Sequence, residues 1–472
     1  MAGTLALDIF AVVFGSIWIT VGIYKLAPVA YFLLDSAFGD TNVYIDAADE
    51  LNEEELPTID ILLPAYDEEA VIKHTLESIR DANYPQELIS LNVMVEPNDE
   101  STREALKELK TGSVFETVGS PRKFMNEIVV PEEYPGESNK PRALNYGFEE
   151  TYADVVGVLD AEDEVDPDLF RKVAGALDVR NYDYVQGILD MENENDGWMN
   201  MMFRGEYGWW YRLHLPAFHN LNYPVPLGGT TNFVSREVLE EISDIRKNRF
   251  GHRWEEDTKG TPESRGWLSK LFNKGLIPWD PINVTEDFEL GHLLWMEGYD
   301  LALIDSVTEE ESPRSLTSWI DQRSRWEKGK IFTFRQYLKH PPGNLYQSFH
   351  VMMQSVLPHL GIINIVGVLL FAILSYLREF HYSQTARYVL FIGFVLIFIE
   401  MVKQTYGYWV ASDKPVKLKI PRAVVSFVTL PVYWLPFWFS DVIAMKEIYT
   451  GDRRWKKTPH EGRHYSQNND EN

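Results

Sequence analysis

The chain contains no cysteine in its 472 residues. This absence excludes disulfide bonds, a thiolate nucleophile and any zinc site with cysteine ligands. Other residue types must therefore supply any catalytic or metal-binding groups.

Basic residues are scarce relative to acidic ones. Lys and Arg number 44 against 71 Asp and Glu, so the formal net charge is −27. Because no basic stripe is available to neutralise phosphates, the sequence argues against nucleic acid as a partner. A surface this acidic suits a halophilic, high-salt cytoplasm, although an ordinary solvated acidic surface has the same composition.

Long apolar runs lie toward both ends of the chain. Residues 5–34 exceed the ~20 residues that a transmembrane helix needs, and no basic n-region or small-residue cleavage site marks a signal peptide. We therefore predict an N-terminal transmembrane helix over 1–36. Lys25, near the end of this run, favours a cytoplasmic location for the domain that follows.

Three more apolar segments cover about 350–377, 388–411 and 423–443. The first two are typical of membrane spans, whereas Pro431 and Pro436 interrupt the third. The flanking loop 412–422 and the tail 452–457 are both basic, and both therefore favour the cytoplasm. A single crossing cannot satisfy both, so we expect the third segment to be broken, re-entrant or interfacial.

The middle of the chain alternates strand and helix patterns. Predicted strands cover 59–64, 91–95, 154–159 and 184–189, and predicted helices cover 68–81, a stretch from about 101, and 167–177. This alternation predicts a doubly wound α/β sheet, in which ligands bind at the carboxyl ends of strands. The polar clusters 67–68, 96–99 and 160–163 all follow predicted strands.

Carboxylates in two of these regions suggest chemistry. Asp160-Ala161-Glu162-Asp163 offers hard oxygen ligands that suit Mg²⁺ or Mn²⁺, or it forms a turn that caps the next helix. Asp287, within Thr285-Glu286-Asp287, is a candidate general base or the N-cap of a helix over 288–297.

A third candidate lies just before the C-terminal apolar segments. If residues 322–329 are helical, Gln322, Arg325, Trp326 and Gly329 share one face. Such a face suits a ligand that is part sugar and part phosphate. The alternative is an interfacial helix whose Arg and Trp lie at headgroup level.

These motifs together resemble the membrane-embedded family-two glycosyltransferases that include cellulose and hyaluronan synthases. The resemblance rests on 64–68 (PAYDE), 160–163 (DAED), 285–287 (TED) and 322–326 (QRSRW), in this order and at the usual spacings. It covers roughly residues 55–340. It implies a GT-A-type, Rossmann-like α/β glycosyltransferase domain with flanking transmembrane helices, a nucleotide-sugar donor that is usually UDP-linked, Mg²⁺ or Mn²⁺, and inversion at the anomeric carbon.

The resemblance also implies site residues. Ala65, Tyr66, Glu68 and Glu96 would contact the nucleoside, and Lys140 would lie near the donor phosphates. Asp160 and Glu162 would bind the metal, and the loop containing Gly229 and Thr230 would line the acceptor site. Glu286 and Asp287 are the candidate catalytic carboxylates, with Asp287 as base. Gln322, Arg323, Arg325 and Trp326 would hold the diphosphate and acceptor, with Arg325 stabilising the leaving group.

Three positions depart from the family pattern. Asp67 stands where the family usually has Asn, Glu96 replaces an Asp, and Glu162 replaces the second Asp of the metal motif. Because Glu is one methylene longer, Asp163 is an alternative metal ligand. The run Glu309-Glu310-Glu311 is interpreted as a solvated loop or a wall of the acceptor site.

The expected organisation follows from these assignments. It comprises the N-terminal helix (1–36), an acidic linker (37–57), a cytoplasmic catalytic domain (58–313), amphipathic interfacial helices (314–345), a C-terminal transmembrane region (346–450) and a polar tail (451–472). The predicted function is inverting sugar transfer to a growing polysaccharide by a multi-pass protein of the cell membrane. The alternatives are transfer of one sugar to a lipid or lipid-linked glycan, and a non-catalytic nucleotide-binding scaffold.

Overall fold

A computed structural model describes residues 2–38, 43–111, 124–257, 275–356, 359, 373 and 383–451. The chain divides into two compact units. The sheet unit comprises 42–193 and 224–318, and the helical unit comprises 1–41, 194–223 and 319–451. The predicted tail 451–472 lies outside the described residues except for Gly451, as does most of the predicted span 350–377.

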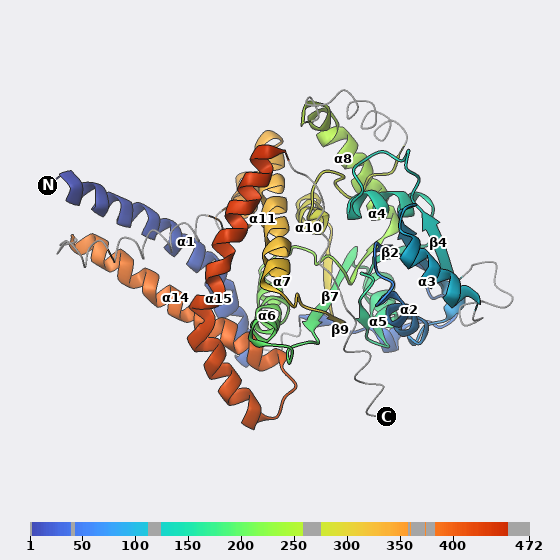
Figure 1. The fold of residues 1–472 in the computed structure, drawn as a ribbon, viewed down its shortest axis with the longest axis horizontal. Coiled ribbons are helices and arrows are strands. Elements are labelled where there is room, and N and C mark those ends of the chain that lie inside the picture. Colours follow the sequence, from blue (N-terminus) through green and yellow to red (C-terminus); the bar gives the residue numbers. More distant parts are fainter. Residues whose placement is uncertain are drawn as a thin grey trace. The chain divides into compact units, whose positions relative to one another are not determined.

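The sheet unit is built on one mixed sheet of nine strands (Figure 1). Their order is β1-β9-β7-β8-β5-β2-β3-β4, and β6 pairs with β9. β8 runs antiparallel to β5 and β7, and β6 antiparallel to β9, whereas the other pairs are parallel. The strands are β1 (Tyr44–Ile45), β2 (Ile59–Ala65), β3 (Ile89–Val95), β4 (Met125–Val129), β5 (Val155–Val158), β6 (Glu164–Val165), β7 (Tyr184–Met191), β8 (Asn232–Ser235) and β9 (Leu301–Glu310).

The four strands predicted from the sequence are all present as β2, β3, β5 and β7. β2 lies between β5 and β3 and is parallel to both. The polar clusters that follow these three strands therefore lie at one edge of the sheet, as predicted. Residues 44–45, within the predicted linker, form β1 and pair with β9.

The helix α2 of the sheet unit buries one apolar face, whereas α4 and α10 are buried over most of their surface. In α2 the buried positions are Ile72, Thr75, Leu76 and Ile79, the i, i+3, i+4, i+7 spacing of an amphipathic helix. The α-helices of this unit are α2 (Ile72–Arg80), α3 (Glu100–Thr111), α4 (Lys140–Glu149), α5 (Leu169–Ala174), α8 (Arg236–Asp257) and α10 (Glu286–Glu297). Short 3₁₀ or π turns cover Ala48–Glu50, Gln86–Leu88 and Gly175–Val179. The core combines these apolar faces with strand residues that are almost completely buried, such as Ile61 and Leu91.

The helical unit contains α1 (Ala2–Phe38), α6 (Trp198–Trp209), α7 (Leu215–Asn220), α11 (Leu316–Lys339, from Trp319 onward), α12 (Leu345–Ser355), α14 (Gln384–Ala411) and α15 (Val416–Thr450). A π turn, Trp210–His214, joins α6 to α7. α14 packs against α1, α6 and α15 (Figure 1). The close approach of α6 and α14 depends on glycine, because a Cβ on Gly208 would meet the Gly407 carbonyl oxygen at 2.3 Å.

Three helices of this unit are long and apolar enough to cross a membrane: Ala11–Ala37, Gln384–Ala411 and Val416–Thr450. The third corrects the prediction of a broken segment. α15 continues for 35 residues through Pro421, Pro431 and Pro436, which spans roughly 50 Å. In hydrocarbon every backbone group needs an internal partner, and a continuous helix supplies most of them despite the missing proline donors.

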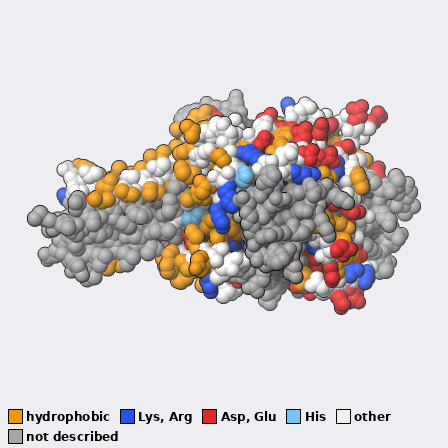
Figure 2. All heavy atoms as spheres, turned by 90° about the horizontal axis from the view of Figure 1, so that it is seen from above, with side chains coloured by type: hydrophobic (Ala, Val, Ile, Leu, Met, Phe, Trp, Pro, Cys, Tyr) orange, Lys and Arg blue, Asp and Glu red, His pale blue; other side chains and the backbone are white. Residues whose placement is uncertain are grey.

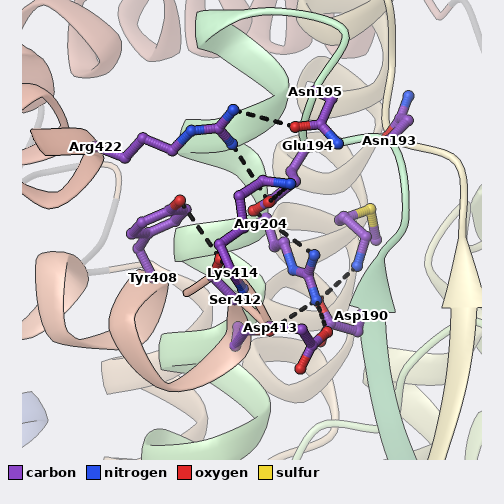
Figure 3. Close-up of polar contacts among 12 residues, drawn as sticks. Asp190, Asn193, Glu194, Asn195, Arg204, Tyr408, Ser412, Asp413, Lys414 and Arg422 are labelled. Carbon is purple, nitrogen blue, oxygen red and sulfur yellow. Dashed lines mark hydrogen bonds and ion pairs between the residues drawn. The ribbon is translucent and has the colours of Figure 1, made fainter. Parts of the chain in front are cut away.

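The basic loop between α14 and α15 is partly neutralised within the helical unit (Figure 3). Lys414 Nζ lies 3.1 Å and Arg422 Nη1 3.3 Å from the same Glu194 oxygen, and Glu194 is buried. Arg204 donates a 2.9 Å hydrogen bond to Asp413. The charges of this loop therefore stabilise local structure. For that reason they are weaker evidence for the side of the membrane on which the loop lies.

Exposed side chains differ in kind over the surface. Large exposed hydrophobic residues are concentrated on α1, α14 and α15, including Phe391 and Val428. In the view of Figure 2 the exposed hydrophobic side chains gather in one region and the Asp and Glu side chains in another. This separation fits a chain with an apolar helical part and an acidic water-facing part.

Candidate active site

Three predicted functional side chains surround Gly229 in the sheet unit. A Cβ placed on Gly229 would lie 3.5 Å from Asp287 Oδ2, 3.6 Å from Lys140 Nζ and 3.8 Å from Asp160 Oδ2. These residues come from α10, from the start of α4 and from the turn after β5. The fold therefore brings residues up to 147 positions apart, Lys140 and Asp287, around one point.

Lys140 is the cation of this group. Its Nζ donates to Asp160 Oδ1 and, at 2.7 Å, to the Gly229 carbonyl oxygen. Burial acts to lower the pKa of Lys140, but the carboxylates of Asp160, Glu286 and Asp287 outweigh it and hold the pKa above its ordinary value. Lys140 is therefore positively charged at neutral pH.

The turn after β5 gathers carboxylates, as predicted. The Asp160 N–H donates to Asp163 Oδ2 at 2.8 Å, and the Thr230 hydroxyl donates to that same oxygen. Asp163 is completely buried, and its Oδ1 has no hydrogen-bond partner among the described residues. The turn does not cap the next helix, because α5 begins only at Leu169 and has Asp168 at its N-cap position.

These carboxylates repel one another. Burial raises the pKa of Asp163, and the charges of Asp160 and Glu162 raise it further. The pKa of Glu310, at the end of β9, is raised by loss of hydration and by the same three carboxylates. A divalent cation would relieve this repulsion and give Asp163 Oδ1 a partner. The residues present therefore fit the predicted Mg²⁺ or Mn²⁺.

The loop that carries Gly229 is held by hydrogen bonds to Gln186, a buried glutamine on β7. Gln186 Oε1 accepts from the Gly228 N–H at 2.8 Å, and its Nε2 donates to the Thr230 and Thr231 carbonyl oxygens at 3.3 and 3.2 Å. Thr231 has a φ of 51°, the left-handed region that a β-branched residue rarely adopts. Such strain persists where the surrounding structure enforces it, often beside functional sites.

Asp287 is presented by the first turn of α10. This helix begins at Glu286 with Thr285 at its N-cap position, so Asp287 is not the N-cap. Glu286 is buried and Asp287 half-buried. Behind the helix, Glu289 and Arg246 form a fully buried ion pair at 2.7 Å that holds α10 to α8. Asp287 therefore projects from a rigid support.

Residues 65–68, the predicted nucleoside-contacting segment, follow β2. Ala65 and Glu68 are buried, Tyr66 is half-buried and Asp67 is exposed. Asp67 has a φ of 54°, and its N–H donates to Asp99 Oδ2 at 3.0 Å. Asn and Asp both adopt this left-handed conformation readily. Asp67 can therefore make the turn that Asn makes in the family pattern.

Glu96 lies at the end of β3 and is held by α4. Arg142 Nη1 donates to Glu96 Oε1 at 2.8 Å, and Asn139 caps the same helix by accepting from the Arg142 N–H at 3.0 Å. The pair fixes the carboxylate at the same sheet edge as Asp67 and Asp160. This position is compatible with the predicted nucleoside contact.

The remaining predicted residues lie on α11 in the helical unit. Residues 322–329 are helical, so Gln322, Arg325 and Trp326 share a face as predicted. Arg323 is buried, and its Nη1 and Nη2 donate to the two oxygens of Glu206 at 2.6 and 2.9 Å. This bidentate pair gives Arg323 a structural role that requires no ligand.

Several site residues were not found from the sequence. Gln186 lies in a hydrophobic strand pattern. Glu310 belongs to an acidic run for which the sequence leaves a solvated loop or a wall of the acceptor site open, and the structure places it at the end of β9. Asn145 exchanges hydrogen bonds of 3.0 and 3.1 Å with the backbone of Trp279 and so ties α4 to the segment before α10. A buried polar residue inside an apolar run is the one signal that could have identified Gln186.

Comparison with solved structures supports the fold described above. A mannosyltransferase from Pyrobaculum calidifontis, PcManGT, solved in complex with GDP-Man and Mn²⁺, has a similar fold. Its TM-score is 0.53 at 14% identity, over 88% of this chain and 99% of that one. The mixed sheet and its helices thus form a GT-A-type glycosyltransferase fold.

The family follows from the sequence match. Residues 155–409 match glycosyl transferase family group 2, and residues 60–243 match glycosyl transferase family 2. The chain belongs to glycosyl transferase family group 2.

Two curated relatives match this chain over a smaller share of their own length than the solved structure does. The chain is 25% identical over 289 residues to the probable glycosyltransferase YdaM of Bacillus subtilis, covering 61% of this chain and 58% of that protein. It is 22% identical over 287 residues to a beta-monoglucosyldiacylglycerol synthase of Synechocystis, covering 60% and 49%. The chain thus spans about half the length of the curated relatives it matches.

Proposed function

We propose that this protein transfers one sugar from a nucleotide-sugar, with inversion, to a lipid or lipid-linked acceptor at a membrane. The observation that carries the proposal is the grouping of Asp287, Lys140 and Asp160 around Gly229. A base, a cation and a metal-binding carboxylate at one point suit displacement of a diphosphate by a hydroxyl group.

The reaction is a single displacement. Asp287 accepts the proton of the acceptor hydroxyl, whose oxygen forms a bond to the anomeric carbon. The bond between that carbon and the diphosphate oxygen breaks, and the diphosphate leaves with the electron pair. Lys140 is positioned to stabilise the developing negative charge. Since one displacement inverts the anomeric carbon, no covalent nucleophile is needed.

Asp160, Glu162 and Asp163 would hold the Mg²⁺ or Mn²⁺, which supplies further charge stabilisation at the diphosphate when bound. The inclusion of Asp163, the alternative ligand expected from the sequence, is supported by its Oδ1, which is buried without a hydrogen-bond partner in the described residues. The predicted roles of Gln322, Arg325 and Trp326 at the diphosphate and acceptor belong to the same proposal.

One observation favours a lipid-borne acceptor over a growing polysaccharide, and a second is compatible with it. The Synechocystis relative is named a beta-monoglucosyldiacylglycerol synthase, a name that describes a glycolipid product. Three helices of the described residues are also able to cross a bilayer, which would bring the enzyme to a membrane-bound acceptor. The donor side would face the cytoplasm, in keeping with Lys25.

The test uses the full chain in membranes or nanodiscs with a panel of UDP- and GDP-sugars, Mn²⁺ and extracted lipids. Nucleoside diphosphate release and product mass are measured together. We expect one nucleotide-sugar to give a lipid product heavier by a single sugar. A ladder of masses would replace the lipid proposal with polysaccharide synthesis. Nucleotide binding without release from any donor would indicate a scaffold.

A further inference from the structure

A second cluster of ionisable groups lies in the helical unit. It joins Glu327 on α11, His359 and Asp441 on α15, all of them buried. One ligand atom from each residue lies within 4.8 Å of the others. Glu327 directly follows Trp326, so the cluster adjoins the predicted ligand-binding face of α11.

The distances within the cluster suit a shared cation. His359 Nδ1 lies 2.9 Å from Asp441 Oδ1 and 3.0 Å from Glu327 Oε2. Two ligands at right angles around an ion ~2.1 Å away stand about 3.0 Å apart, so these separations match neighbouring positions in a coordination shell.

Hydrogen bonding alone leaves the cluster incomplete. An imidazole nitrogen carries at most one hydrogen, so His359 Nδ1 can donate to Asp441 Oδ1 but not to both carboxylates. Glu327 Oε2, which faces the same nitrogen, accepts no hydrogen bond in the described residues, and neither does Asp441 Oδ2. Buried carboxylate oxygens without donors are costly, so a further positive group at these two oxygens would stabilise the cluster.

Nearby lysines supply only part of the positive charge that would stabilise these carboxylates. Lys330 Nζ lies 2.9 Å from Glu327, but on the other oxygen, Oε1. Lys328, the next cation on α11, is 2.8 Å from Glu447 of α15. Lys330 therefore pairs with one oxygen of the Glu327 carboxylate, whereas the oxygen that faces His359 accepts no hydrogen bond in the described residues.

We infer that Glu327, His359 and Asp441 bind a divalent transition-metal ion of the Zn²⁺ or Mn²⁺ class. One imidazole nitrogen and two carboxylate oxygens suit these ions. The ion links α11 to α15, which already meet through Lys328–Glu447 and through the 3.2 Å hydrogen bond from Trp319 to Tyr433 (Figure 1). It is distinct from the ion expected at Asp160 and acts by fixing the helix that carries Gln322, Arg325 and Trp326.

The first test uses the unaltered full chain in detergent, with any affinity tag removed. The protein is stripped with EDTA, dialysed, loaded with Mn²⁺ and measured by pulsed EPR. We expect nitrogen coupling from His359. The other candidate groups in the described residues, Asp160–Asp163 and Glu164–Glu192–Glu309, offer only oxygen ligands. A spectrum without nitrogen coupling would overturn the inference.

The second test counts bound ions in an Asp160→Asn background, which weakens the other site. Each of His359→Gln and Asp441→Asn should lose about one ion per chain, as in a three-ligand site. Glu447→Gln is the matched control, because it removes the other buried carboxylate that joins α15 to α11 but leaves the three ligands intact. Equal metal content in His359→Gln and the control would refute the site, even if both fold normally.

Discussion

The most direct test of the active site is Asp287→Asn. Asn has nearly the same shape as Asp, and α10 keeps its Thr285 N-cap position and the Glu289–Arg246 pair. The fold and the donor site should therefore persist, whereas the base is lost. A general base contributes ~10²–10⁴-fold to a rate, which corresponds to about 3–5 kcal/mol of transition-state stabilisation.

The assay follows nucleoside diphosphate release at saturating donor and acceptor, with Mn²⁺-dependent nucleotide binding and Tm measured on the same samples. We expect kcat to fall by ~10²–10⁴-fold while nucleotide affinity and Tm stay close to those of the unaltered chain. Glu297→Gln is the control, because Glu297 lies on the same helix and, among the described residues, forms a partly exposed salt bridge of 3.0 Å with Arg249. A variant Asp287→Asn with turnover within a few-fold of the control would remove Asp287 from its role as base.

Other changes test separate parts of the structure. Gly229→Ala should reduce kcat by more than ~10-fold with little change in Tm. The reason is that the new methyl group would occupy the point between the reacting groups, at ordinary contact distance from each. Gly343→Ala is the control, because its added methyl group would have one neighbour, at 3.7 Å. Thr230→Val should lower stability by ~1–3 kcal/mol in chemical denaturation, since it removes a donor to buried Asp163; unchanged stability would contradict that reading. Burial and then the charges of Lys403 and Lys25 lower the pKa of His214 well below its ordinary value. The unfolded chain therefore binds the extra proton, and stability should fall by about 1.4 kcal/mol per unit as the pH drops below ~6.5, a slope that His214→Gln should remove.

Local sequence patterns predicted much of the fold. The apolar runs of β2, β3, β5 and β7 and the spacing of α2 were recognised because strands and helices of this kind are specified by nearby residues. Asp160 and Asp287 are candidates from the acidic clusters themselves and from the resemblance, whereas Lys140 is identified through the resemblance alone. The proline-containing α15 was misjudged, because a sequence pattern does not show whether a long helix accommodates its prolines.

Residues that act through distant partners were not predictable in this way. Gln186 matters because β7 lies beneath the loop of Gly228 to Thr231, and Asn145 because α4 meets Trp279. The cluster of Glu327, His359 and Asp441 combines one residue of α11, one of α15 and one that lies between these helices in the sequence. Its first and last members are 114 positions apart. No periodicity or spacing along the chain relates such residues.

The sequence by itself determined the types of element, the acidic and apolar division of the chain and the candidate residues for the proposed sugar transfer. Only the tertiary structure decided that Asp287, Lys140 and Asp160 surround Gly229, that Arg323 is held by Glu206, and that a second ionisable cluster is buried on α11. The physical reason is the distance along the chain over which each effect acts. Propensity and amphipathicity act over a few neighbouring residues, whereas a site is defined by chain segments that meet only when the sheet and helices pack.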